Sequence, residues 1–241
     1  MRASVSYGER QVEYSISVNN QLTDRVRIHV HPNGSVEVES PVGKSDAEIA
    51  KAILKRARWI DSNLRQFERL REHSLPRQYV SGETHFYLGR RYQLKVIDGV
   101  RGASCVRMKG GRIHVELPHA DPAAIKRRLN AWYKSRATSY FEDRLNEISS
   151  GIRWVDTPPP VKLVKMKKQW GSCSPSGSVY LNPMLIKAPR ECVDYVIVHE
   201  LCHLMEHNHS KRFYSLLQTH CPNWQHVKSK LDGMAELLLA E

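Results

Sequence analysis

The sequence predicts an α+β protein: a β-rich N-terminal part with one long helix, followed by a C-terminal subdomain built from a β-hairpin and a helix. Residues 11–41 and 79–117 alternate apolar and polar side chains, as half-buried strands do. Residues 45–72 and 121–148 instead repeat apolar side chains every three or four positions, which is typical of helices. A third helical pattern covers residues 189–207.

We expect three parts along the chain. Residues 1–118 should form the β-rich region with its long basic helix, and residues 119–157 a connecting helix with a proline-rich linker. Residues 158–241 should form a metal-binding catalytic region, because they contain the densest group of histidines.

The N-terminal region contains a predicted hairpin and a capped helix. Strands at residues 25–31 and 35–39 flank Pro32-Asn33-Gly34, a strong turn signal. Ser45 and Glu48 form a capping box for a helix that should continue to about residue 72.

The connecting helix has clear boundary signals. Asp121 is the expected N-cap, Pro122 suits the first helical position, and Gly151 should close the helix. Three consecutive prolines, residues 158–160, then form a stiff linker.

The C-terminal region should contain a hairpin and several helices. Residues 161–168 read as a strand, residues 170–177 as a turn, and residues 179–182 as the partner strand. Further helices are predicted around Phe213 and from Trp224 to Leu239. A strand beside a catalytic helix could bind an extended peptide through its free edge, or could simply cover the helix.

Composition limits the class of protein. The 241 residues contain no apolar run long enough to span a membrane, and no signal peptide precedes the first strand, so we expect a cytoplasmic location without membrane association. The five cysteines include no C-x-x-C pair, which favours reduced thiols.

The net charge of +12 lies mainly in residues 1–150. The basic side chains between Lys51 and Arg71 are the first place to look for an acidic partner, such as nucleic acid or a nucleotide. A solvated basic surface is the alternative interpretation.

The sequence His199-Glu200-Leu201-Cys202-His203 has the pattern H-E-x-x-H. On a helix, His199 and His203 lie on one face and can bind the same ion, while Glu200 can reach a water beside it. A catalytic zinc usually has three protein ligands. His207 or His209 could be the third; we favour His209, because a helix that stops near Asn208 lets the chain turn back to the ion.

At these residues the chain resembles the YgjP-like metal-dependent hydrolases, relatives of SprT-type and other zincin metallopeptidases. The resemblance rests mainly on the C-terminal block, with weaker matches in the front part: Gln169–Cys173, Leu181–Asn182, Asp194–Ser210, Phe213, Pro222–Trp224, Arg25–Ile28 and Ser81–Gly89. It implies a zincin-like C-terminal subdomain with zinc held by His199, His203 and His209, and with Glu200 as the catalytic base.

The leading hypothesis is therefore a zinc metallopeptidase, in which Glu200 acts as general base on a zinc-activated water that attacks a peptide or protein substrate. One alternative, suggested by a family label, is a metal-dependent nucleoside triphosphate (UTP) pyrophosphatase. Another is a non-catalytic, zinc-stabilised module that binds nucleic acid. The sequence leaves the oligomeric state open.

Overall fold

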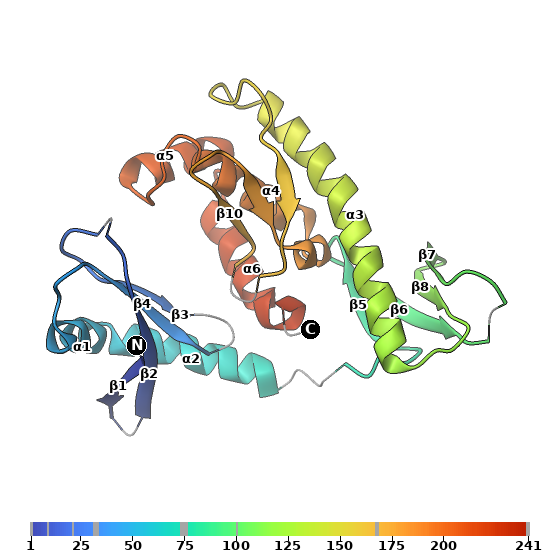
Figure 1. Cartoon of the computed structure of the whole chain (residues 1–241), viewed down its shortest axis with the longest axis horizontal. Helices are drawn as coiled ribbons and strands as arrows, with labels where there is room; N and C mark the ends of the chain where they lie inside the picture. Colours follow the sequence, from blue (N-terminus) through green and yellow to red (C-terminus); the bar gives the residue numbers. More distant parts are fainter. Residues whose placement is uncertain are drawn as a thin grey trace. The chain divides into compact units, whose positions relative to one another are not determined.

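The computed structural model describes residues 2–8, 10–20, 22–30, 34–72, 77–99, 101–166 and 169–239. Within helix and strand segments, it leaves out the side chains of residues 2, 66, 67, 69–72, 236 and 239. The predicted hairpin tip at Pro32 and Asn33, and the side chains of Arg69 and Arg71 in the basic helix, therefore lie outside the described part. The chain is a mixed α+β protein, as predicted, and divides into two compact units, Met1–Leu75 and Pro76–Leu239 (Figure 1).

The first unit packs two helices on a four-stranded sheet of order β1-β2-β4-β3. Strand β2 is antiparallel to β1 and parallel to β4, and β3 is antiparallel to β4. The strands are β1 (Arg2–Tyr7), β2 (Arg10–Val18), β3 (Arg27–Val30) and β4 (Val36–Ser40). The inward side chains of the sheet, such as Val12 and Val38, are almost fully buried.

The predicted long helix consists of two, α1 (Asp46–Lys55) and α2 (Ala57–Glu72), separated at Arg56. The capping box between Ser45 and Glu48 is present. Arg56 leaves helical geometry, with φ −111° and ψ 6°, yet the apolar stripe continues across the break. Packing against the sheet therefore maintains one buried face through both helices; its buried members are Ile49, Ile53, Ala57, Ile60 and Leu64.

The second unit begins with a sheet of the same kind. Its order is β5-β6-β8-β7, and its pairing directions repeat those of the first sheet: β5 and β6 antiparallel, β6 and β8 parallel, β7 and β8 antiparallel. The strands are β5 (Thr84–Tyr87), β6 (Arg90–Ile97), β7 (Cys105–Lys109) and β8 (Arg112–Glu116).

Helix α3 (Pro122–Ser150) connects this sheet to the C-terminal elements. Asp121 caps it, Pro122 opens it and Gly151 follows its last residue, as predicted. One face buries a side chain at every fourth position, from Ile125 to Leu145. That face contacts β7 and β8 near one end and β9 and α4 further along (Figure 1).

This shared core places the domain boundary differently from the sequence-based division at residue 118. The apolar residues of β5–β8 and those of the C-terminal helices form one buried cluster around α3. Residues 77–118 therefore belong with the C-terminal region, and the division into compact units falls between Leu75 and Pro76.

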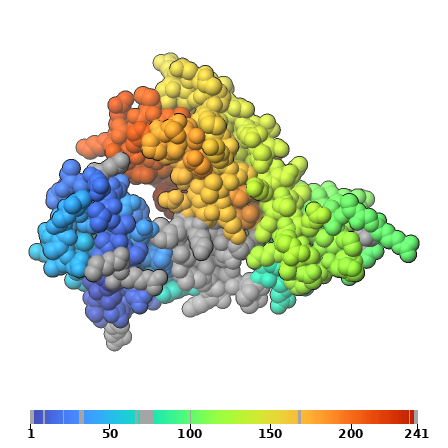
Figure 2. Space-filling model, in the orientation of Figure 1, coloured from blue at the N-terminus to red at the C-terminus, as the bar shows by residue number. Residues whose placement is uncertain are grey.

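The C-terminal elements are a three-stranded sheet and four helices. The sheet has the order β10-β11-β9 and contributes to the surface coloured gold and orange in Figure 2. The elements are β9 (Val161–Leu163), β10 (Gly171–Cys173), β11 (Val179–Leu181), the 3₁₀ helix η1 (Pro183–Lys187), α4 (Arg190–Cys202), α5 (Lys211–His220) and α6 (Trp224–Leu239). None of the helices that the structure describes is long and apolar enough to cross a membrane.

The predicted hairpin of this region is wrong in one respect. Strand β9 pairs with β11 in parallel, and the antiparallel partner of β11 is β10, which lies within the stretch predicted to be a turn. The side chain of the buried Asn182, just after β11, supports this pairing. Its amide donates to the carbonyls of Met166 and Gln169 and so holds the segment between β9 and β10.

The β5–β6 turn supports the start of α4. The amide of Leu88 donates to the carbonyl of Ile186, and the amide of Gly89 to that of Lys187. Gly89 has a φ of +77°, and a Cβ atom there would lie 2.8 Å from the Cα of Pro189, the residue that precedes α4. Both the backbone conformation and the close approach require glycine.

We predict that Gly89→Ala lowers the free energy of unfolding more than Gly99→Ala does. Gly99 has a similar φ of +74°, but a Cβ atom added there would have nothing within 4 Å. Gly99→Ala therefore measures the cost of backbone strain alone. The additional loss at Gly89 should be about 1–3 kcal/mol, because the Pro189 backbone must move. Urea unfolding followed by circular dichroism measures both; equal losses would contradict the packing role.

Candidate metal centre

Helix α4 carries the H-E-x-x-H residues inside the core of the second unit. From Val193 to Cys202 its side chains are buried except for those of Asp194 and His199, which are half-buried. The last helical residue is Cys202, and His203 is the C-cap. The sequence predicted a helix to about His207, but the amides of His203 and Leu204 already bond three residues back, which tightens the last turn and ends the helix early.

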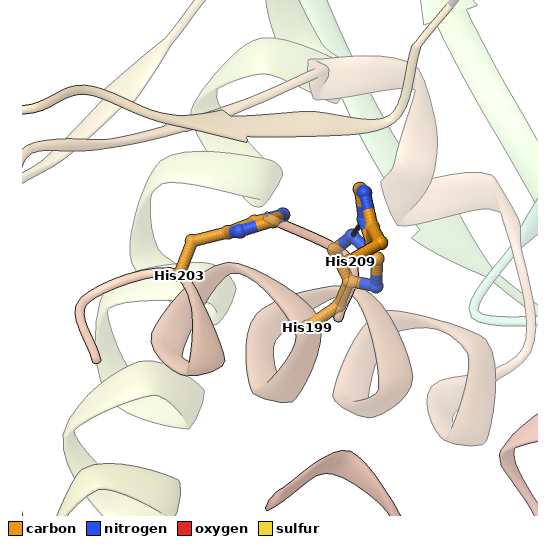
Figure 3. A group of neighbouring side chains, drawn as sticks. All are labelled: His199, His203 and His209. Atoms are coloured by element: carbon orange, nitrogen blue, oxygen red, sulfur yellow. Dashed lines mark hydrogen bonds between the residues drawn. The ribbon is translucent and has the colours of Figure 1, made fainter. Parts of the chain in front are cut away.

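The early end of α4 brings three histidines together (Figure 3). His199 and His203 extend from α4, and His209 comes from the segment before α5. Their potential ligand atoms all lie within 4.8 Å of one another, and the Nε2 atoms of His199 and His209 are 3.0 Å apart. His207, the alternative third ligand, is exposed and does not belong to this group.

The chemistry of these rings fits a metal ion. Burial lowers the pKa of His199 to about 3 and lowers that of His203, so both are neutral at physiological pH and keep a lone pair for a metal. Nδ1 of His203 lies 3.1 Å from the carbonyl oxygen of Glu206, which can only accept, so the proton is on Nδ1 and Nε2 is free to bind. Two imidazoles on a tetrahedral zinc have nitrogens about 3.3 Å apart, close to the separation seen for His199 and His209.

Phe213, at the start of α5, contacts all three histidine rings. Its ring centroid lies 4.9 Å from that of His199 and 4.6 Å from those of His203 and His209. The ring is fully buried, so it forms an apolar wall that fixes the imidazoles by packing. The sequence predicts a helix at Phe213, but no local signal in it indicates contact with the three histidines.

Glu200 is buried beside the histidines. Its side chain is 4% exposed, and Oε2 has no hydrogen-bonding partner among the residues that the structure describes. Burial raises the pKa of this carboxyl to about 8. An uncompensated buried carboxyl is costly, which is typical of functional sites rather than of cores built for stability.

Gly171 in β10 lies directly against Glu200. A Cβ atom at this position would be 2.8 Å from Oε1 and 3.0 Å from Cγ of Glu200. Strand β10 can therefore approach the carboxylate only because residue 171 has no side chain. The signal in the sequence was a glycine inside Trp170-Gly171-Ser172, since a glycine within a strand often marks a close approach.

Two ion pairs hold α4 in place. Arg144 of α3 makes a bidentate pair with Asp194, at 2.6 and 3.0 Å, and the pair raises the pKa of the guanidinium. Lys230 of α6 lies 2.6 Å from Oε1 of Glu191. These contacts fix the helix that carries the histidines from two sides.

One comparison with known protein families matches most of the chain. The family model described as YgjP-like, metallopeptidase domain, matches residues 24–234. A search of curated proteins finds no match.

Two solved structures are similar to part of the chain. The metallopeptidase zymogen abylysin of Pyrococcus abyssi shares 24% identity, with a TM-score of 0.36, over 40% of this chain and 94% of its own. The metallopeptidase zymogen jannalysin of Methanocaldococcus jannaschii shares 24% identity, with a TM-score of 0.32, over 38% of this chain and 96% of its own.

The family match covers most of the chain and includes every residue of the histidine group and Glu200. The chain therefore belongs to the YgjP-like family and contains a metallopeptidase domain.

Proposed function

We propose that the protein is a zinc-dependent peptidase with a zincin-like catalytic subdomain, in which His199, His203 and His209 hold the metal and Glu200 is the general base. The observation that carries the proposal is the buried, unpaired carboxylate of Glu200 on the same helical turn as the two histidines. The family match supports peptide hydrolysis at the level of reaction class.

Zinc is the ion that this donor set favours. Three imidazole nitrogens suit zinc better than magnesium or calcium, which prefer oxygen ligands. A zinc ion held there would supply Lewis acidity, lowering the pKa of a coordinated water and polarising the substrate carbonyl.

Glu200 is suited to move a proton. A carboxylate beside a metal-activated water can take a proton from the water and pass it to the leaving amine, and Glu200 follows His199 directly on α4. Because the group is almost fully buried, bulk water does not compete for the proton.

Strand β10 is suited to hold the substrate. It is an edge strand of the described three-stranded sheet, so one side of its backbone is available to an extended peptide. Its first residue, Gly171, contacts Glu200, which would bring a peptide paired with this edge close to the base.

We predict that His203→Ala and His209→Ala strongly reduce zinc content, because each removes one of three nitrogens from the group. Zinc in the purified proteins can be measured by mass spectrometry. His207→Ala is the matched control, since His207 lies in the same loop but outside the group. A loss of zinc in His207→Ala equal to that in His209→Ala would contradict the assignment.

We predict that Glu200→Gln retains zinc and lowers kcat about 10²–10⁴-fold on a peptide substrate, because the amide cannot accept the proton. Activity can be screened with fluorogenic peptides and casein. Glu142→Gln, which changes an exposed carboxylate on α3, is the control and should stay active. Full turnover by zinc-loaded Glu200→Gln would contradict the assignment of Glu200 as the general base.

We predict that Gly171→Ala keeps zinc and stability but lowers kcat by at least about tenfold, since the new methyl displaces the Glu200 carboxylate. Ser172→Ala, in the same strand, should change kcat little. Comparing kcat, KM and zinc content separates displacement of the base from loss of substrate or metal. Unchanged kcat in Gly171→Ala would show that the strand does not position Glu200.

A further inference from the structure

A second candidate site lies in the first unit, away from the histidine group in sequence. A surface hollow of roughly 660 Å³ opens between the start of β3 and the helices α1 and α2. One wall is formed by β3 and the segment just before it. The other wall is formed by one face of helices α1 and α2. The lining residues are Asp24, Arg25, Val26, Ile28, Lys44, Glu48, Ala52, Lys55, Arg56 and Trp59.

The helical wall follows from sequence spacing. Glu48, Ala52, Lys55 and Trp59 follow one another at intervals of three or four positions, which places them on one face across the α1–α2 break, and Arg56 lies at the break beside Lys55. Ala52 has a short side chain between the charged ones and leaves room for the hollow. The half-buried Val26 and Ile28 supply apolar surface on the opposite wall.

The charges around the hollow do not balance. Lys44 lies 3.4 Å from Asp24 and 3.9 Å from Glu48, so both acidic side chains of the lining are paired with the same lysine. Glu48 is also engaged in the capping box. Arg25, Lys55 and Arg56 form no ion pair within the described part of the chain. With four cations and two carboxylates in its lining, the hollow has a net charge of +2, and an anion there would reduce the mutual repulsion of Arg25, Lys55 and Arg56.

Trp59 adds a flat aromatic surface beside these cations. Its side chain is 46% exposed, which is unusual for the largest apolar residue. Cations together with an exposed aromatic ring are the combination that binds nucleotides, through phosphate contacts and base stacking.

We propose that this hollow binds single-stranded nucleic acid, with a base stacked on Trp59 and neighbouring phosphates on Arg25, Lys55 and Arg56. Stacking requires a base that is free of its own duplex neighbours, which favours a single strand over a duplex. All four side chains are exposed, so they are accessible to a ligand on the surface of the unit. The proposal does not rest on the peptidase activity.

The test is fluorescence anisotropy of a labelled oligothymidylate of about 12 nucleotides, titrated with the full-length chain at several salt concentrations. The combined variant Arg25→Gln/Lys55→Gln/Arg56→Gln should bind more weakly and reduce the slope of log affinity against log salt by about 2. Trp59→Ala should weaken binding by about 5- to 150-fold, whereas Trp59→Phe should retain most of the affinity.

A charge-matched control uses the sheet of the second unit. Lys95, Lys109 and Arg112 are exposed and also form no ion pair within the described residues, and Lys95→Gln/Lys109→Gln/Arg112→Gln removes the same charge. This control should bind like the wild type. Equal losses in both triple variants would overturn the proposed site.

Competition distinguishes nucleic acid from other anions. Unlabelled oligothymidylate should displace the probe far better than thymidine monophosphate, inorganic polyphosphate or a duplex of equal length. The proposal would be overturned if the wild type failed to bind the oligonucleotide. It would also be overturned if polyphosphate displaced the probe as well as the oligonucleotide does and Trp59→Ala had no effect on binding.

Discussion

The burial of Glu200 is the constraint on which the second unit depends. A carboxyl group with an unpaired oxygen in an apolar environment is destabilising, so the surrounding structure must hold it in place. Helix α3, the β5–β6 turn and α6 all contact or anchor α4, and β10 closes over the carboxylate at Gly171. The extensive apolar cluster of this unit supplies the stability that offsets this cost.

Local signals in the sequence predicted what depends on local chemistry. The caps at Ser45 and Asp121, the proline at position 122 and the glycine at position 151 fixed helix ends correctly, because each acts within one turn of its own helix. The H-E-x-x-H spacing similarly placed His199 and His203 on one face, since the period of the helix is fixed.

Features that depend on tertiary contacts could not be predicted in this way. The strand β10 and the contact of Phe213 with three rings arise from packing between separate segments. The end of α4 at Cys202 comes with hydrogen bonds three residues back, at a point where the sequence has no glycine or proline to mark it. The compact units also differ from the parts expected from sequence, because alternation predicts strands in residues 79–117 but not which helix covers them.

The two four-stranded sheets, with identical order and pairing directions, create a hazard during folding, because a strand of one could add to the other. The charges that face one another across neighbouring strands differ between the two sheets. In the first sheet Arg27 and His29 face Glu39 and Glu37, whereas in the second, Arg107 and Lys109 of β7 face His114 and Arg112 of β8. The native β7–β8 pair thus already sets basic side chains against basic ones, so charge does not keep the two sheets apart. Each sheet is instead retained by the apolar cluster that it shares with the helices of its own unit, α1 and α2 in the first and α3 in the second.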